Sequence, residues 1–219
     1  MSDFTPADVD EYIVGTLIPA DPVLTETLRL SSEAGLPDIA VSAAMGQLLN
    51  ILVASVGAKR VLEIGTLGGY STTCMARALP PDGELISLEY EPKHAEVARA
   101  NLARAGVADR VRVIVGPAIE TLPTLSGPFD FIFIDADKRS NPDYFLAAVG
   151  LSRPGTLIYI DNTVRGGRIL QADADDQDVQ GIRRLHDLVG SDRRVTATGV
   201  QTVGSKGHDG FILARVNSA

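Results

Sequence analysis

Hydrophobic residues follow two different spacings along the chain, and the spacing changes near residue 60. In the first part they recur at the period of an α-helix and form one apolar face, made of Met45, Leu48, Leu49, Leu52, Val53 and Val56. The pairs Thr5-Pro6 and Asp21-Pro22 are typical helix starts, because proline is tolerated at the first helical position. We therefore expect three helices before residue 60, the third starting at Ser42.

Beyond this point, short apolar runs alternate with helical segments. The runs are residues 61–64, 85–89, 111–115, 129–135 and 157–161, and the helical segments are residues 71–79, 92–105 and 118–125. Such alternation predicts a parallel sheet with right-handed crossovers. Residues 179–189 are then expected to be helical, and 195–203 and 211–216 to be strands joined by a short link that allows antiparallel pairing at one edge.

Length and composition suit a single α/β domain. Of the 219 residues, 1–58 would form the N-terminal helices and 59–219 the α/β core. The longest apolar runs are far shorter than the roughly 20 residues that cross a bilayer, and the acidic N-terminus lacks the basic start of a signal peptide. The net charge of -8 disfavours nucleic-acid binding. We expect a cytoplasmic protein that binds neither membranes nor nucleic acid.

Oxygen-bearing side chains follow two of the apolar runs. Asp135 ends one run, and Asp161 with Asn162 ends the next. If these strands are neighbours, roughly 4.8 Å apart, the three side chains converge at one edge of the sheet. An all-oxygen set suits Mg²⁺, or Ca²⁺ or Mn²⁺, rather than zinc. Lys138 adds a cation beside Asp135, so we predict a functional metal site rather than helix caps alone.

A glycine-rich turn follows the first strand, at residues 65–71. Its spacing departs from the dinucleotide fingerprint G-x-G-x-x-G, which disfavours a pyrophosphate ligand. Glu63, just before the turn, would repel a phosphate but attract a cationic ligand. Glu89 ends the second strand, where an acidic side chain usually binds ribose hydroxyls. The turn therefore predicts an adenosine-containing ligand without phosphates.

Several motifs at matching spacing identify a family. They are Glu63-Ile64-Gly65-Thr66 with Gly69-Tyr70-Ser71, the segment 131–138, Arg153-Pro154-Gly155 with Asp161-Asn162, and the segment 203–211. Together they resemble the cation-dependent O-methyltransferases, the group that contains catechol and caffeoyl-coenzyme A O-methyltransferases, and the likeness covers residues 39–216. The resemblance implies a Rossmann-like, seven-stranded, mostly parallel sheet with an antiparallel edge strand, helices on both faces and extra N-terminal helices. It also implies a homodimer.

The resemblance further implies S-adenosylmethionine as methyl donor, S-adenosylhomocysteine as product, and a role for each matching residue. The implied cofactor-binding residues are Val41, Ser42, Glu63, Gly65, Thr66, Tyr70, Ser71, Glu89, Ala118, Ile119 and Asp135. The implied metal ligands are Asp135, Asp161 and Asn162, and Lys138 is the implied catalytic base. Three protein oxygens leave room for two substrate oxygens on an octahedral ion, which favours a vicinal diphenol as acceptor.

The identity of the acceptor is less sharply determined than that of the donor. Residues 1–58 contain one basic residue, Arg29, so the phosphates of coenzyme A would find little to bind there, and we expect a small catechol-like acceptor. A relative that methylates 5-hydroxyuridine in transfer RNA would need a basic face around the acceptor opening. A nicotinamide-dependent oxidoreductase and a non-catalytic dimeric scaffold are two further hypotheses compatible with this type of sheet. The three histidines, His94, His186 and His208, are expected on the surface.

Overall fold

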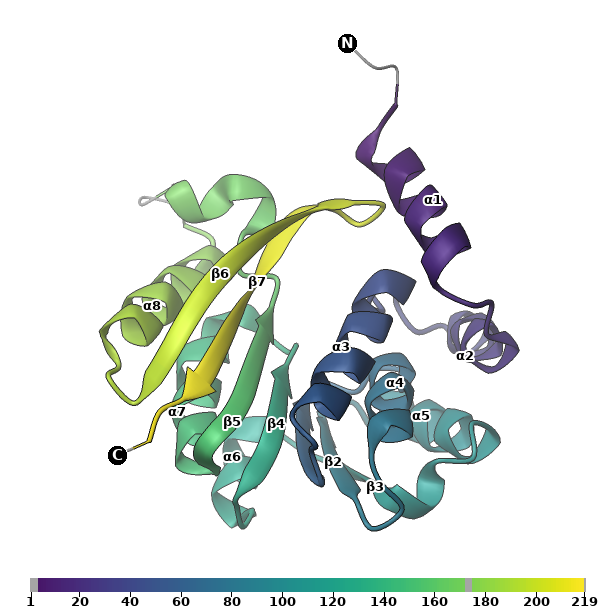
Figure 1. Ribbon diagram of the computed structural model, residues 1–219, viewed down its shortest axis with the longest axis horizontal. Coiled ribbons are helices and arrows are strands. Elements are labelled where there is room, and N and C mark those ends of the chain that lie inside the picture. Colours follow the sequence, from purple (N-terminus) through teal and green to yellow (C-terminus); the bar gives the residue numbers. More distant parts are fainter. Residues whose placement is uncertain (1–3, 172–174, 219) are drawn as a thin grey trace.

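Seven strands form one sheet in the order β3-β2-β1-β4-β5-β7-β6 (Figure 1). The computed structural model describes residues 4–171 and 175–218. The strands are β1 (Arg60–Ile64), β2 (Glu84–Glu89), β3 (Val111–Val115), β4 (Phe129–Ile134), β5 (Ser152–Asp161), β6 (Val195–Gly204) and β7 (Gly207–Val216). The first five pair in parallel, and β7 pairs antiparallel with both β5 and the edge strand β6. The expected fold class is confirmed.

Helices cover both faces of this sheet (Figure 1). They are α1 (Pro6–Leu17), α2 (Pro22–Glu33), α3 (Ala43–Ser55), α4 (Tyr70–Ala78), α5 (Pro92–Arg104), α6 (Ala118–Thr121), α7 (Asn141–Gly150) and α8 (Gln177–Ser191). Side chains of α3, α4 and α5 pack in one hydrophobic cluster, and those of α7 and α8 pack in a second cluster. Strands β1 and β4 contribute to both clusters, which explains their unbroken apolar runs.

The predicted starts of the first three helices are confirmed by their caps. The side chains of Thr5, Asp21 and Ser42 each accept a hydrogen bond from a backbone N–H in the first turn of the following helix. Several expectations differ from the structure. Strand β5 begins at Ser152 rather than at residue 157, and β7 begins at Gly207 rather than at residue 211. The helix predicted at 118–125 ends at Thr121 and continues as a 3₁₀ turn containing Pro123, and helix α7 was not predicted.

The strand register brings the candidate residues to one edge of the sheet. Ile64 pairs with both Leu88 and Ile134, and Ile134 pairs with Ile160. The residues that follow these positions are Gly65, Glu89, Asp135 and Asp161. They therefore meet at the carboxyl ends of four adjacent strands, where ligands bind in open α/β sheets. Among the described residues, no helix is long and apolar enough to cross a membrane.

Candidate active site

A pocket of about 1280 Å³ lies over the carboxyl ends of the central strands. Eleven of the fourteen residues predicted for the site line it: Val41, Gly65, Thr66, Tyr70, Ser71, Glu89, Ala118, Ile119, Asp135, Lys138 and Asn162. The other three do not. Ser42 caps α3, and Glu63 and Asp161 are buried beneath the pocket wall.

The glycine turn approaches the end of β4 so closely that a side chain would not fit. A Cβ atom at Gly65 would lie 2.1 Å from the carbonyl oxygen of Asp135, and the φ angle of Gly65 is +100°. The N–H of Asp135 donates to the carbonyl of Ile64 over 2.8 Å, which fixes the two chain segments together. The glycine turn after β1 and the acidic segment after β4 are thus in direct contact at this position.

Glu89 holds the turn from the neighbouring strand. Its Oε2 accepts hydrogen bonds from the backbone N–H groups of Thr66 (3.1 Å) and Leu67 (2.8 Å), and its Oε1 accepts one from the N–H of Glu91 (2.9 Å). His94 Nδ1 lies 3.5 Å from Oε1. His94, expected on the surface, is partly exposed and lies in the pocket wall beside Glu89.

Glu63 is fully buried and does not reach the pocket wall. Its carboxylate accepts hydrogen bonds from Ser71 Oγ (2.5 Å), Thr72 Oγ1 (2.5 Å) and Ser87 Oγ (2.6 Å). Burial raises the pKa of Glu63 to about 7, although these three hydroxyls favour the charged form. The role predicted for Glu63 therefore needs correction, because its side chain lies behind Ser71 and positions that pocket-lining hydroxyl.

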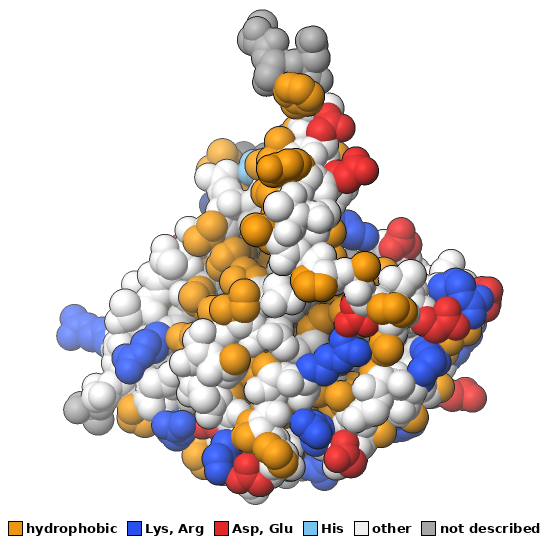
Figure 2. Space-filling view, turned by 45° about the vertical axis from the view of Figure 1, so that its right-hand side comes forward, with side chains coloured by type: hydrophobic (Ala, Val, Ile, Leu, Met, Phe, Trp, Pro, Cys, Tyr) orange, Lys and Arg blue, Asp and Glu red, His pale blue; other side chains and the backbone are white. Residues whose placement is uncertain are grey.

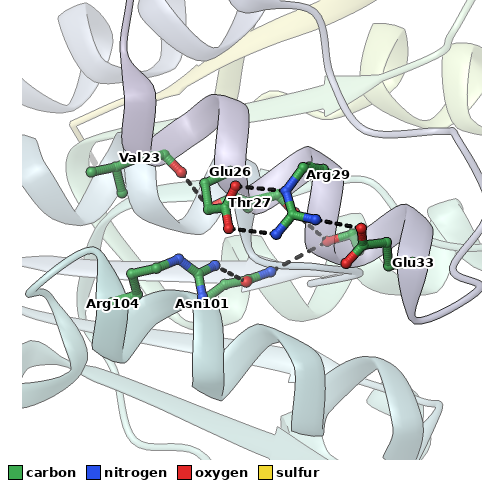
Figure 3. A network of polar contacts seen from close by, with 8 residues as sticks. Val23, Glu26, Thr27, Arg29, Glu33, Asn101 and Arg104 are labelled. Carbon is green, nitrogen blue, oxygen red and sulfur yellow. Dashed lines mark hydrogen bonds and ion pairs between the residues drawn. The ribbon is translucent and has the colours of Figure 1, made fainter.

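A polar network joins α2 and α5 (Figure 3), and Asn101 extends it to the glycine turn. Asn101 on α5 is 1% exposed, and its Nδ2 donates to the carbonyl of Gly68 (2.8 Å) and to Ser31 Oγ on α2 (3.3 Å). Arg104 donates to Asn101 Oδ1. A Cβ atom at Gly68 would lie 2.1 Å from Ser31 Oγ, so a side chain there would force Ser31 to move. Helix α2 is thus fixed against the turn and forms one wall of the pocket.

Two carboxylates and an amide lie at the ends of β4 and β5, which are adjacent and parallel. Lys138 Nζ donates to Asp135 Oδ1 over 2.6 Å. Asp161 is 8% exposed; burial, and then the nearby charge of Asp135, raise the pKa of Asp161. In the described part of the chain, no three His, Cys, Asp or Glu side chains are grouped for metal binding. A metal here would therefore depend on the amide of Asn162 as well as on the two carboxylates.

Comparison with known proteins identifies the family. A model described as O-methyltransferase matches residues 17–216. The chain belongs to the O-methyltransferase family. It is 54% identical over 212 residues to a catechol O-methyltransferase of Mycobacterium tuberculosis, covering 96% of each chain. This match and the family model confirm the resemblance inferred from the motifs.

Two solved structures agree with this assignment along nearly the whole length of the methyltransferase. The O-methyltransferase from Bacillus cereus in complex with SAH has a TM-score of 0.95 and 49% identity, covering 97% of this chain and 98% of that one. The O-methyltransferase TomG from Streptomyces achromogenes, in complex with SAM, has a TM-score of 0.94 and 47% identity, covering 97% of each. The expectation of an S-adenosylmethionine-dependent O-methyltransferase is confirmed, in place of a nicotinamide-dependent oxidoreductase.

Several parts of the pocket of this methyltransferase were not predicted from the sequence. Residues 36–40 and the side of α2 line it, and so does Arg165, three residues after Asn162. Tyr144 on α7 also lines the pocket, and its hydroxyl donates to Asp137 Oδ1 over 2.5 Å. The spacing of Tyr144 and Phe145 with Ala148 and Val149 was a helical signal that would have placed Tyr144 on α7.

Proposed function

We propose that this methyltransferase transfers a methyl group from S-adenosylmethionine to one hydroxyl of a small vicinal diphenol, with a divalent cation at Asp135, Asp161 and Asn162. The observation that carries this proposal is that Asp135, Lys138 and Asn162 line the pocket that also contains the glycine turn. Asp161, at the end of the adjacent strand β5, lies close enough for the charge of Asp135 to raise its pKa. The relative named catechol O-methyltransferase supports the acceptor class.

The residues fit a hard divalent cation. Burial, and then the nearby charge of Asp135, make Asp161 costly to ionise, and a cation beside both carboxylates would offset that cost. Carboxylate and amide oxygens are the ligands that Mg²⁺ prefers, and Ca²⁺ and Mn²⁺ accept the same ligands. When bound, such an ion lowers the pKa of an acceptor hydroxyl and orients it. A diphenol offers two oxygens to this site, whereas a monophenol offers one.

The protein's own residues would bind the donor, orient the acceptor and remove the proton of the acceptor hydroxyl. Glu89, held against the turn by the backbone N–H groups of Thr66 and Leu67, would accept hydrogen bonds from the ribose hydroxyls of the donor. Val41, Tyr70, Ser71, Ala118 and Ile119 would surround the rest of the donor. Lys138 Nζ, as a neutral amine, would accept the proton of the acceptor hydroxyl. The pocket walls would hold the nucleophilic oxygen of the bound acceptor near the methyl group.

The test compares catechol with phenol, using labelled S-adenosylmethionine and protein freed of metal by a chelator. We expect no transfer without metal, restored catechol methylation with Mg²⁺, and nearly no phenol methylation. Donor binding, measured by calorimetry, should survive metal removal because the donor contacts lie at the ends of other strands. Full activity without metal, or equal rates on the two phenols, would contradict the proposal. Methylation confined to 5-hydroxyuridine-containing transfer RNA would assign the protein to RNA modification instead.

We also propose that the protein forms a homodimer through its N-terminal helix. Figure 2 shows hydrophobic side chains along the projecting helix, and α1 has no buried residue in the single chain. Its large apolar side chains Tyr12 and Leu17 are each 73% exposed, and Phe4, just before the helix, is 76% exposed. The helix is anchored at its inner side, where Asp10 accepts from the N–H of Ser205 in the β6–β7 turn (2.8 Å). Light scattering should give twice the chain mass, and Tyr12→Glu should shift the protein toward monomer.

A further inference from the structure

Among the residues that the structure describes, Arg165 is the lysine or arginine of the pocket wall without an acidic partner. Four basic side chains line the pocket: Arg29, Lys138, Arg139 and Arg165. Lys138 pairs with Asp135 (2.6 Å), Arg139 with Asp137 (4.0 Å), and Arg29 with Glu26 (2.7 Å). Within the described residues, the guanidinium of Arg165 has neither an ion pair nor a hydrogen bond. A half-buried guanidinium without a partner offers five donors to a ligand.

The backbone around Arg165 is held in an unusual conformation. Arg165 has a φ of +55°, in the left-handed region that disfavours residues with a side chain. The next two residues, Gly166 and Gly167, also have positive φ, which glycine adopts freely. One carboxylate oxygen of Asp209 accepts hydrogen bonds from the N–H groups of Val164 (3.0 Å) and Arg165 (2.9 Å). The fold thus maintains an arginine at a position where glycine would cost less. This points to a use for the side chain rather than for the backbone alone.

Arg165 lies at the acceptor end of the pocket. It follows β5 by four residues and lines the same pocket as Asn162, from the end of β5, and Lys138, from the end of the adjacent strand β4. The proposed donor residues Glu89, Ala118 and Ile119 follow β2 and β3, on the other side of β1. An unpaired cation beside the proposed acceptor site therefore selects among acceptors, not among donors.

We propose, building on the proposed function, that Arg165 recognises a carboxylate on the acceptor, so that the preferred substrates are anionic vicinal diphenols. A guanidinium matches a carboxylate with two parallel hydrogen bonds, and a partly enclosed pocket strengthens them. A polyanion such as RNA fits less well, because acidic side chains outnumber lysines and arginines in the pocket wall by five to four. The acidic residues are Asp38, Glu89, Asp135, Asp137 and Asp178. One unpaired cation in such a lining suits one negative charge.

The experiment measures kcat/KM for 3,4-dihydroxybenzoate and for 3,4-dihydroxybenzamide, its neutral analogue of similar shape. The variants are Arg165→Gln, Arg165→Lys and, as matched control, Arg168→Gln. Arg168 lies in the same segment but pairs with Asp176 (2.6 Å) and does not line the pocket. Comparing the two acceptors within each variant, and then across variants, cancels the difference in hydroxyl acidity between the acid and the amide.

We expect Arg165→Gln to lower the acid-to-amide ratio of kcat/KM by roughly 10- to 100-fold, the worth of a charged hydrogen bond. Arg165→Lys should retain part of the preference, Arg168→Gln all of it, and the KM for the donor should not move in any variant. An equal loss on both acceptors in Arg165→Gln would mean a structural role and would overturn the inference. So would an unchanged ratio while both acceptors are methylated. If the wild type methylates neither acceptor, the proposed function itself fails.

Discussion

Glu63 gives the protein a pH-dependent stability that a single substitution should remove. Its carboxyl is fully buried, and burial raises its pKa from 4.5 to about 7. Between these two values the folded protein keeps a proton that the unfolded chain has lost, so the folded state is destabilised as the pH rises through this range. Since one pKa unit corresponds to about 1.4 kcal/mol, the charged form costs about 3 kcal/mol above pH 7.

Glu63→Gln mimics the protonated carboxyl and removes this cost. Like the neutral acid, the amide presents one acceptor and one donor group to the hydroxyls of Ser71, Thr72 and Ser87, which can rotate to match. In protein without ligand, the variant should therefore gain stability relative to the wild type by about 3 kcal/mol between pH 4.5 and pH 8. Most of the gain should appear between pH 4.5 and 7.

The assay is urea unfolding followed by circular dichroism at several pH values, with the difference in unfolding free energy plotted against pH. Taking the difference cancels the titration of other groups that both proteins share. Glu96→Gln, at an exposed position on α5, serves as control and should follow the wild type throughout. A difference that stays constant from pH 4.5 to pH 8 would refute the reasoning about burial.

Three further substitutions test separate parts of the pocket. Lys138→Ala should lower catechol turnover by a factor of roughly 10² to 10⁴ without changing donor affinity. Turnover equal to that of the wild type would show that Lys138 is not the catalytic base. Glu89→Ala should weaken S-adenosylhomocysteine binding, measured by calorimetry, by roughly 1.5 to 3 kcal/mol, and an unchanged Kd would remove Glu89 from the donor site. Asn101→Ala should raise the donor KM more than it lowers kcat, because the turn loses its bond at Gly68. Asn50→Ala, which removes a similar bond to Cys74, should change neither.

The strands could be predicted from the sequence because their signal is local. β1 and β4 are buried on both faces, so their apolar runs are unbroken, and the caps of the first three helices are encoded in neighbouring residues. Helix α7 was not predicted because its apolar residues directly follow a 3₁₀ turn, and the two together resemble an irregular loop. Helix α6 is shorter than predicted because Pro123 has no N–H to continue its hydrogen bonds.

The site could be predicted from the sequence only where its functional side chains lie close together in one short motif. Asp135 and Lys138 stand in one short segment, and the turn with Glu63 stands in another. The contribution of Asn101 depends on a contact between helices α2 and α5 and the turn, which no local pattern encodes. Arg165 is equally hidden, since its place in the pocket follows from a loop conformation fixed by Asp209 in β7.

The two halves of the pocket differ in how they are held, and this difference bears on specificity. The proposed donor half, around the glycine turn, is fixed by buried groups from three elements: Glu89 on β2, Asn101 on α5, and Glu63 on β1 acting through Ser71. A turn restrained from three sides needs little reordering on binding, so a substitution there should affect donor affinity first. The acceptor half includes the loop after β5, where one carboxylate, Asp209, sets the backbone of Arg165. Changes in this loop can therefore alter the acceptor while the donor site and the sheet beneath it remain intact.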